Sequence, residues 1–508
     1  MHTLDLFVIV AYLVVIAAIG LRLSGRQRSA ADYFVGEGQL SWWAVCFSIV
    51  ATETSTLTVI SVPGVAYLGA YGYVELAFGY LIGRIIVAMV MLPLYMRGDL
   101  VSAYQYLGLR FGKKVQGLAS VTFLVTRLLA EGVRLFAAAI PIALLLTAMG
   151  VNASYLEIIL VLTAVTVGYT YIGGIRAVVW TDAIQMMLYV GGAILSAAIL
   201  LTDTPLSALG AAWHADKFQV FNFHSPILTD PYAFVAAIFG GAVFTMASHG
   251  ADQLMVQRIL GCKSLADGRK AMIGSAIFVM AQFALFSFVG TLLWIHYGGQ
   301  TPHQLGLTDS DQLFPRFIIR QLPPGVSGLL IAGILGATMG SLSSAMNSMS
   351  NSTVTDLIRL FGRRQYSDKT MLRISRITTL VWAGALVGFA SMFTDTNSPV
   401  IVLGLSITGY TYGALLGAFL LGLLIKRANQ RDGAIAFVMT LIVMAVVVLD
   451  VKIHGQSLAF PWFVPIGAAI TLLVGGGLSL THPARVSDEQ PLAAVGDRND
   501  SNRLRMRS

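Results

Sequence analysis

This chain has 508 residues, of which 56% are hydrophobic and only 11% are charged, and its mean hydropathy is +0.75. Soluble globular domains carry about 25% charged residues, so this composition excludes a soluble domain and predicts a protein embedded in a lipid bilayer. The formal net charge of +8 could instead indicate an anionic partner such as a nucleic acid. The positions of the basic residues decide between these two explanations of the charge.

The expected elements, in chain order, are apolar helices. A helix of about 20 apolar residues crosses a bilayer, and about thirteen segments qualify. They begin near residues 4, 41, 73, 116, 154, 179, 231, 271, 325, 376, 398, 433 and 461. We expect an all-α polytopic membrane protein with a single transmembrane domain over residues 1–482. The remainder, 483–508, mixes charges and small residues without periodicity, which predicts a disordered cytoplasmic tail.

Basic residues gather on one side of the membrane in this arrangement. If the N-terminus lies outside, most of the 33 Lys and Arg residues, Arg258 among them, fall in inward loops and the tail. The exceptions are the outer residues Lys217, Arg316, Arg320 and Lys452 and the membrane residues Arg84, Arg127 and Arg134. This is the positive-inside pattern. It predicts a cell-membrane protein with an external N-terminus, a cytoplasmic C-terminus and no nucleic-acid partner.

The second and seventh segments carry matching polar interruptions. The first interruption is ATETSTLT, which contains Glu53, and the other is TMASHGADQ at 245–253. Polar breaks at corresponding positions of two halves point to an inverted-repeat secondary transporter. Carbonyls freed at membrane depth can be satisfied by a bound cation or substrate. The alternative is that Ser and Thr hydroxyls bond carbonyls of their own helix.

The ninth segment, GILGATMGSLSSAMNSMSNS at 333–352, is unusually rich in hydroxyls. Helical spacing places most of its central serines on one face. They are Ser341, Ser343, Ser344 and Ser348. A hard cation prefers hydroxyl and carbonyl oxygens, so the face is a candidate ion site. The alternative is a helix-packing surface built on the GxxxG pair of Gly336 and Gly340.

Six motifs occur along the chain in a characteristic order. They are ADYFVGEGQLSWW (31–43), SVPGVAY (61–67), YQYLGLRFG (104–112), GGIRAVVWTDAIQ (173–185), DQLMVQR (252–258) and GATMGSLSSAMNS (336–348). Together they resemble the sodium:solute symporter family, over roughly residues 31–430. The resemblance implies a LeuT-type core of two inverted five-helix repeats. The repeats would span about 41–202 and 231–425, with extra helices at about 4–23, 433–450 and 461–481.

The resemblance also implies a function, which is the sodium-coupled import of a small organic solute by alternating access. No HExxH, GxSxG or P-loop motif is present, so we do not expect an enzyme. A transporter-like sensor is an alternative, but it would need an output domain, and only a short tail follows the last segment. The expected partners are a small-molecule substrate, a sodium ion and the lipid bilayer, with sodium as the only metal.

The family's common sodium site can be carried over residue by residue. The resemblance implies carbonyl ligands from Ala51 and Thr54 at the first interruption, the carbonyl of Ala337 and the hydroxyl of Ser341. The neighbouring family position usually holds a hydroxyl residue, but here it is Gly340. One ligand is therefore lost, which predicts a weaker site or one completed by water.

A second ion site occurs in the sialic acid branch of the family. The resemblance implies that it would combine Asp182 with Ser343 and Ser344. Aspartate is also a favoured helix N-cap. Asp182 therefore has a structural alternative at the start of the sixth segment.

Glu53 lies at the interruption, where the proline branch carries an aspartate. An ionised carboxylate at membrane depth needs a partner. Three interpretations follow: Glu53 accompanies sodium, it pairs with a buried arginine, or it is protonated. The third would give a proton-linked symporter, for a neutral solute or an amino acid.

The fourth segment places Arg127, Glu131 and Arg134 on one helix face. Two arginines against one glutamate leave a positive charge, and a guanidinium suits a substrate carboxylate. This favours a carboxylate-bearing solute. The alternative is a structural ion pair, Glu131 with Arg134 or Glu53 with Arg127.

Further polar residues are candidates to line the substrate site. They are Thr58, Glu75, Ser248, His249 and Gln282. His249 could carry a proton during transport, or it could be a hydrogen-bonded structural histidine.

Overall fold

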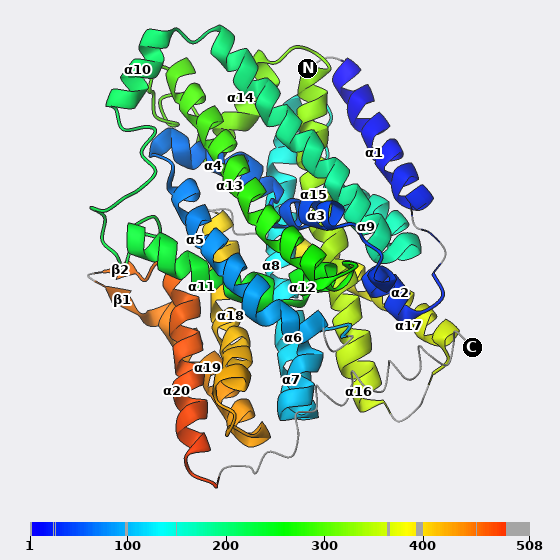
Figure 1. Ribbon diagram of the computed structural model, residues 1–508. Helices are drawn as coiled ribbons and strands as arrows, with labels where there is room; N and C mark the ends of the chain where they lie inside the picture. The colour runs from blue at the N-terminus through cyan, green and yellow to red at the C-terminus, as the bar shows by residue number, and fades with distance from the viewer. Residues whose placement is uncertain are drawn as a thin grey trace.

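The computed structural model describes residues 3–23, 25, 27–96, 100–148, 150–362, 366–392, 400–453 and 455–483. Within them the chain is helical, apart from loops and a two-stranded antiparallel hairpin of β1 (Lys452–Ile453) and β2 (Gln456–Ser457). Long helices lie side by side in a bundle (Figure 1). The predicted tail lies outside the described residues, except for residue 483.

The first half of the bundle follows α1 (Thr3–Leu23) and the short α2 (Ala30–Val35). Its helices are α3 (Trp42–Glu53), α4 (Thr56–Leu68), α5 (Gly72–Ile86), α6 (Leu92–Met96), α7 (Ala103–Phe111), α8 (Lys113–Ala148) and α9 (Tyr155–Thr202). A π-helical turn, η2 (Val87–Met91), joins α5 to α6 without a break. The outer α10 (Leu206–His214) then leads to the second half.

The second half begins with helical turns that end in a break. Its elements are η3 (Ala236–Gly240), α11 (Gly241–Met246), η4 (Ala247–Ala251), α12 (Gln253–Leu260), α13 (Leu265–His296), α14 (Leu313–Gln321), α15 (Val326–Ser352), η6 (Thr353–Ile358), α16 (Arg359–Phe361), α17 (Asp368–Met392) and α18 (Val400–Leu424). Two helices follow, α19 (Gln430–Asp450) and α20 (Phe463–Ser479). Figure 1 shows α1 beginning at the top of the bundle and α20 ending at the bottom.

Among the described residues, eight helices are long and apolar enough to cross a membrane, and nine if the bent pair α3–α4 counts as one span. Two shorter apolar helical stretches, 236–251 and 408–424, fall below this length. The described helices therefore support a polytopic membrane protein, while the count of thirteen spans stays a prediction.

The fifth and sixth expected spans form one helical run, α9, which is kinked at Gly174. This glycine has φ 54° and ψ −150°, a conformation that strains any residue with a side chain. A Cβ atom at this position would also lie 2.4 Å from the carbonyl oxygen of Tyr33. The kink therefore depends on glycine, both for the backbone angles and for the close approach of α2.

Helix α15 is the most deeply buried span and lies in the centre of the bundle (Figure 1). Small residues let α9 and α1 approach its backbone. A Cβ at Gly333 would lie 3.1 Å from the Cα of Tyr189, and one at Gly336 would lie 2.6 Å from the hydroxyl of Tyr12. The glycines of the hydroxyl-rich segment therefore serve helix packing, as the alternative interpretation proposed.

A short outer segment lies against α4. The 3₁₀ turn η5 (Ser310–Gln312) and α14 correspond to the amphipathic stretch DSDQLFPRFIIRQL. Ser61 donates a hydrogen bond to Asp311 (Oγ–Oδ2 2.9 Å), and a Cβ at Gly64 would lie 2.9 Å from the carbonyl oxygen of Ser310. The segment thus covers the half-helix that follows the first break.

Candidate functional site

The first interruption is a true helix break. Helix α3 ends at Glu53, α4 begins at Thr56, and the two axes differ by 66°. Ser55 is the N-cap of α4, but its side chain makes no capping hydrogen bond. The break therefore brings the carbonyl end of one half-helix and the amide end of the next together inside the bundle, as the sequence predicted.

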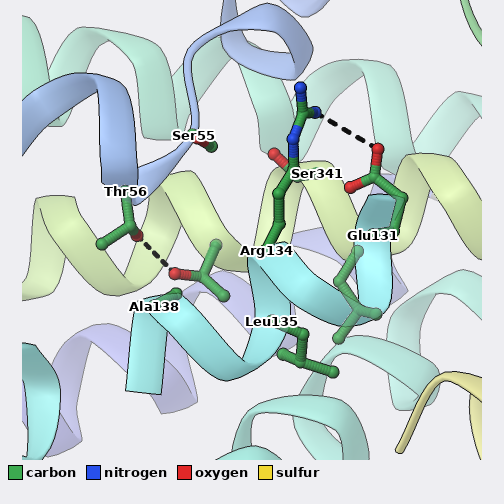
Figure 2. Close-up of a pocket in the computed structure, with 9 residues that line it drawn as sticks. Ser55, Thr56, Glu131, Arg134, Leu135, Ala138 and Ser341 are labelled. Atoms are coloured by element: carbon green, nitrogen blue, oxygen red, sulfur yellow. Dashed lines mark hydrogen bonds and ion pairs between the residues drawn. The ribbon is translucent and has the colours of Figure 1, made fainter. Parts of the chain in front are cut away.

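A small cavity lies where this break meets α8 and α15. Its volume is about 10 Å³, which is room for roughly one water-sized group. Its lining comprises Ser55, Thr56, Glu131, Arg134, Leu135, Ala138, Thr338, Ser341 and Leu342. Figure 2 shows Ser55 and Thr56 of the break on one side of it, and Arg134 and Ser341 on the others. The cavity thus joins a predicted sodium ligand to a predicted carboxylate ligand.

The predicted sodium ligands on α15 lie directly against the break. Ser341 donates to the carbonyl of Ala337 (3.2 Å), so these two oxygens are neighbours. Thr56 bonds the hydroxyl of Thr338 (2.5 Å) and the carbonyl of Ile334 (2.8 Å), which fixes α4 to the same helix. The donor set consists only of neutral oxygens, and this suits a hard monovalent cation.

Ala51, Thr54 and Gly340 complete the predicted sodium set. Ala51 and Thr54 are buried at the end of α3, and Thr54 donates its amide to Val50 (3.0 Å). At Gly340 a Cβ would lie 3.0 Å from Gln185 Oε1 and 3.2 Å from Asp182 Oδ1. Position 340 therefore faces the second predicted ion site closely, and it offers no side-chain oxygen to the first.

Asp182 lies at the centre of a buried polar network. Its Oδ2 accepts hydrogen bonds from Ser48 (2.7 Å) and Ser344 (3.4 Å). Among the described residues, its Oδ1 has no hydrogen-bond partner. Asp182 is far inside α9 and caps no helix, so the N-cap alternative is wrong. Ser343 turns away and bonds the carbonyl of Gly340 (3.0 Å).

Arg258 is part of this network, which corrects its predicted place in an inward loop. The side chain is 1% exposed, and its Nη2 lies 3.4 Å from Asp182 Oδ2. It also donates to Ser48 (2.9 Å) and to Ser344. Arg258 belongs to α12, which continues inside the bundle after the second break. A guanidinium therefore already sits on one side of the predicted second ion site.

The second interruption also breaks its helix, after the π-helical turn η4. The break is at Asp252, whose backbone is extended (φ −97°, ψ 126°). Its Oδ1 accepts the amide of Leu254 (2.8 Å) and so caps α12. Its Oδ2 pairs with Arg127 Nη2 (2.5 Å). The protein itself thus caps the helix start at this break and pairs the charge of the capping carboxylate.

The charged face of α8 is fully paired, which corrects the predicted excess of positive charge. Arg127 binds Asp252, Glu131 (2.9 Å) and the hydroxyl of Tyr412 (2.5 Å). Arg134 binds the same oxygen of Glu131 (3.2 Å), and its side chain is 21% exposed. The predicted excess counted only the charges on the fourth segment and left out Asp252, which lies at the second break and pairs with Arg127. Of the two arginines, Arg134 alone lines the cavity.

Glu53 pairs with a buried arginine, but with Arg84 of α5 instead of Arg127. Arg84 also donates to Ser275 of α13 (2.7 Å). His249 Nε2 lies 3.8 Å from Glu53 Oε2, and His249 Nδ1 bonds the hydroxyl of Ser248 (2.8 Å). The second of the three interpretations of Glu53 therefore matches the structure.

The other candidates divide into near and distant residues. Gln282 donates to the hydroxyl of Thr54 (2.7 Å) at the first break. Thr58 is buried on α4. Glu75 instead accepts the amide of Asn222 (3.1 Å) and anchors an outer loop. Glu75 is therefore not brought together with the break residues.

Sequence reasoning missed three residues of these networks, Arg84, Arg258 and Asp252. Arg84 was recognised as a membrane arginine, but nothing indicated its partner. Asp252 stood inside the second interruption, and its place before a polar helix start was a usable capping signal.

Comparison with known proteins agrees with this architecture. The sequence pattern described as the sodium:solute symporter family matches residues 33–446. The chain belongs to this family. The sodium/sialic acid symporter NanT of Aliivibrio fischeri is 28% identical over 486 residues, covering 93% of this chain and 92% of the relative. The human sodium/iodide cotransporter is 28% identical over 433 residues, covering 84% of this chain and 66% of the relative.

A solved structure supports the same assignment at the level of the fold. The substrate-bound outward-open state of a Na⁺-coupled sialic acid symporter matches this symporter with a TM-score of 0.83 and 25% identity. The match covers 95% of this chain and 99% of that chain. The predicted all-α LeuT-type fold is thereby confirmed. The chain is a sodium-coupled solute symporter, and sodium is its coupling ion.

Proposed function

We propose that this symporter imports a small monocarboxylate, bound at the first break with its carboxylate on Arg134. One observation carries the proposal: the cavity joins Arg134, the uncapped start of α4 and Ser341. Sodium would bind beside it, to the carbonyls of Ala51, Thr54 and Ala337 and the hydroxyl of Ser341. Sodium supplies a positive charge next to the carbonyl end of α3.

Two features of the cavity suit an anion. The amides at the start of α4 receive no side-chain cap from Ser55, and the start of a helix favours negative charge. Among the described residues, Arg134 has one carboxylate partner, Glu131, which it shares with Arg127. Its guanidinium can therefore present a second edge to a substrate carboxylate. The relatives named for sialic acid also carry an acid.

Charge balance around the two breaks favours one sodium ion with one monoanion. Four arginines pair with four carboxylates in this region. They are Arg84, Arg127, Arg134 and Arg258 with Glu53, Glu131, Asp182 and Asp252. A buried net charge is expensive in a membrane. Sodium and a monocarboxylate bound together add no net charge, whereas sodium and a neutral solute add one.

The pairing of Glu53 bears on the proton-linked alternative. Glu53 forms an ion pair with Arg84, and this contact gives no support to a carrier that takes up its proton on Glu53. A second ion at Asp182 stays a prediction. It would have to bind through Oδ1 or displace Arg258 from Oδ2.

The remaining parts of the proposal concern topology. An N-terminus outside and a C-terminus in the cytoplasm, in the cell membrane, follow from the positive-inside pattern. The start of α1 and the end of α20 at opposite ends of the bundle support this orientation (Figure 1). Transport would then proceed without covalent chemistry on the substrate.

Sodium-driven uptake in proteoliposomes tests the proposal. We expect short monocarboxylates to be taken up with an inward sodium gradient and not with choline. Arg134→Gln should weaken carboxylate binding by at least 10-fold, since a charge-assisted bond contributes about 1.5–3 kcal/mol. Uptake of neutral solutes alone, or an unchanged affinity in Arg134→Gln, would contradict the carboxylate site.

Ser341→Ala tests the sodium site separately. Loss of one oxygen ligand should raise the sodium concentration for half-maximal uptake by about 5–10-fold, for a lost contact of about 1 kcal/mol. The maximal rate at saturating sodium should change little. Ser348→Ala is the matched control, because Ser348 lies on the same helix and its only hydrogen bond among the described residues is to the carbonyl of Ala345 (3.1 Å). An unchanged sodium requirement in Ser341→Ala would refute this ligand.

A further inference from the structure

A second group of polar side chains lies immediately before the first break, around Glu53. Arg84 pairs with Glu53, His249 approaches the same carboxylate to 3.8 Å, and Gln282 bonds the adjacent Thr54. Thr245 precedes His249 by one helical turn, and a Cβ added at Gly83 would lie 3.0 Å from the Cβ of Thr245. The neighbours of Glu53 thus come from α5, α11, η4 and α13.

Four polar atoms of this group lack partners among the described residues. We name the group the Glu53 cluster: Glu53, Arg84, Thr245, His249 and Gln282. The unpaired atoms are Arg84 Nε, Thr245 Oγ1, His249 Nε2 and Gln282 Oε1. All four side chains are at most 3% exposed. Each such atom left without a bond costs about 1–3 kcal/mol, so together they mark a place where a ligand supplies the missing bonds.

The unpaired atoms define the chemistry of that ligand. Arg84 Nε is a donor and Gln282 Oε1 is an acceptor. His249 Nδ1 is hydrogen-bonded to the Ser248 hydroxyl, and His249 Nε2 is a donor or an acceptor according to the ring tautomer. Thr245 can do both. A carboxylate would satisfy only the donors and an ammonium only the acceptor. A group that both donates and accepts, such as a hydroxyl or an amide, fits the whole set.

The cluster lies close to the proposed carboxylate position. Glu53 precedes the cavity residue Ser55 by two positions, which is at most about 7 Å of extended chain. The side chain of Glu53 is 15% exposed, so part of it is accessible to a molecule of the size of water. One short molecule can therefore place its carboxylate at Arg134 and a second polar group at the cluster.

We propose, on the basis of the function proposed above, that the Glu53 cluster makes this symporter selective for short monocarboxylates that carry a second group able to donate and accept hydrogen bonds. Hydroxy acids and amido acids belong to this class. Plain aliphatic acids of the same length would bind but leave the cluster unsatisfied. A site built to bond such a group rejects an analogue that lacks it, because the buried partners are left unpaired.

Matched pairs of acids test this selectivity on the full-length protein in proteoliposomes. Lactate is compared with propionate, and 3-hydroxybutyrate and 4-hydroxybutyrate with butyrate, as competitors of sodium-driven uptake. We expect at least one hydroxy acid to compete at a concentration 10-fold or more below that of its deoxy parent. Lactamide, which keeps the hydroxyl but lacks the carboxylate, should compete poorly.

A variant then ties the preference to the cluster. Gln282→Leu removes one unpaired atom and should reduce the hydroxy-acid preference to about threefold or less, measured within the variant as the ratio between each hydroxy acid and its deoxy parent. Thr291→Val, on the same helix but outside the cluster, should keep the full preference. A preference that survives in Gln282→Leu would place the selecting groups elsewhere and overturn the assignment.

The outcomes separate this inference from the proposed function. Equal competition by hydroxy acids and their deoxy parents, with intact sodium dependence, would refute the selectivity and leave the carboxylate site standing. No competition by any carboxylate would refute the proposed function itself. The wild-type comparison alone decides between these cases, so the test does not depend on a variant that folds.

Discussion

The two helix breaks occupy corresponding places in the two halves of the molecule, but the helix starts that follow them are capped differently. At the second break, Asp252 caps α12 and pairs with Arg127. At the first, Ser55 offers no side-chain cap, and the break borders a cavity. The helix start at the second break is therefore capped from within the protein, whereas the helix start at the first break has no side-chain cap and borders a cavity that a ligand can enter.

This difference indicates how a repeated fold becomes a transporter with one central site. A broken helix at membrane depth exposes polar backbone that must find partners. Capping one helix start with a fixed side chain leaves the uncapped helix start at the other break available to a ligand. Ligand binding at the first break can then shift the balance between conformations, because only groups that differ in affinity between states do so.

The largest expected effect comes from opening the second break. Asp252→Asn keeps a capping side chain but removes the charge that pairs with Arg127, so we expect a loss of about 3 kcal/mol in stability, as for a buried pair that loses one partner. Thermal unfolding of the detergent-solubilised protein measures this loss. Ser55→Ala is the matched change at the first break, and it should alter the unfolding temperature little.

A double-mutant cycle sharpens this prediction. Adding Arg127→Gln to Asp252→Asn removes the unpaired charge, so the double variant should be more stable than the sum of the single losses implies. If Ser55→Ala and Asp252→Asn lowered the unfolding temperature equally, side chains would stabilise the two breaks to the same extent. The difference proposed here between the two breaks would then be wrong.

A smaller effect is expected from restoring the hydroxyl that the first break lacks. Gly340→Ser supplies a side-chain oxygen where the family usually carries one, and Gly340→Ala is the control for crowding, since any Cβ there lies 3.0 Å from Gln185 Oε1. One added ligand contributes about 1 kcal/mol, so the sodium concentration for half-maximal uptake should be about fivefold lower in the serine variant than in the alanine variant. Indistinguishable sodium curves would show that position 340 is no ligand position here.

The sequence predicted the breaks well because polar residues are conspicuous at membrane depth. ATETSTLT and TMASHGADQ contain the residues at which α3 and η4 end, and the hydroxyl-rich segment became the buried α15. These features are local, so composition and spacing are sufficient to find them. The all-α polytopic fold follows from the same hydropathy pattern.

The ion pairs were predicted poorly because they depend on which helices meet. The sequence placed Arg127 and Glu131 on one helix face, where they do pair, but the shorter contact of Arg127 is to Asp252 of the other half. Glu53 pairs with Arg84 and Asp182 with Arg258 for the same reason. Charge counting along one helix therefore misjudged the net charge of the site.

The smallest expected effect concerns access to the first break past the turn η5, which packs on α4. Burial of the Asp311 carboxyl is the main reason that its pKa is raised from the ordinary value of 3.8 to about 6. The hydrogen bond from Ser61 lowers this pKa, and the negative charge of the neighbouring Asp309 raises it. At a pH between 3.8 and about 6, the carboxyl of Asp311 is protonated when the turn is packed and ionised when Asp311 is exposed. The packed turn therefore gains stability as the pH falls through about 6.

Hydrogen exchange of the backbone amides in 309–321 measures this gain. From pH 7 to pH 5 the packed turn should be stabilised by about 1 kcal/mol, which slows exchange about fivefold beyond the intrinsic pH effect. Asp311→Asn has no proton to gain and should show only the intrinsic effect. Because η5 lies on α4, the wild-type protein should also admit solutes to the first break more slowly at pH 5. Equal pH dependence in wild type and variant would mean that Asp311 does not govern the turn, and entry to the open break would then be controlled elsewhere.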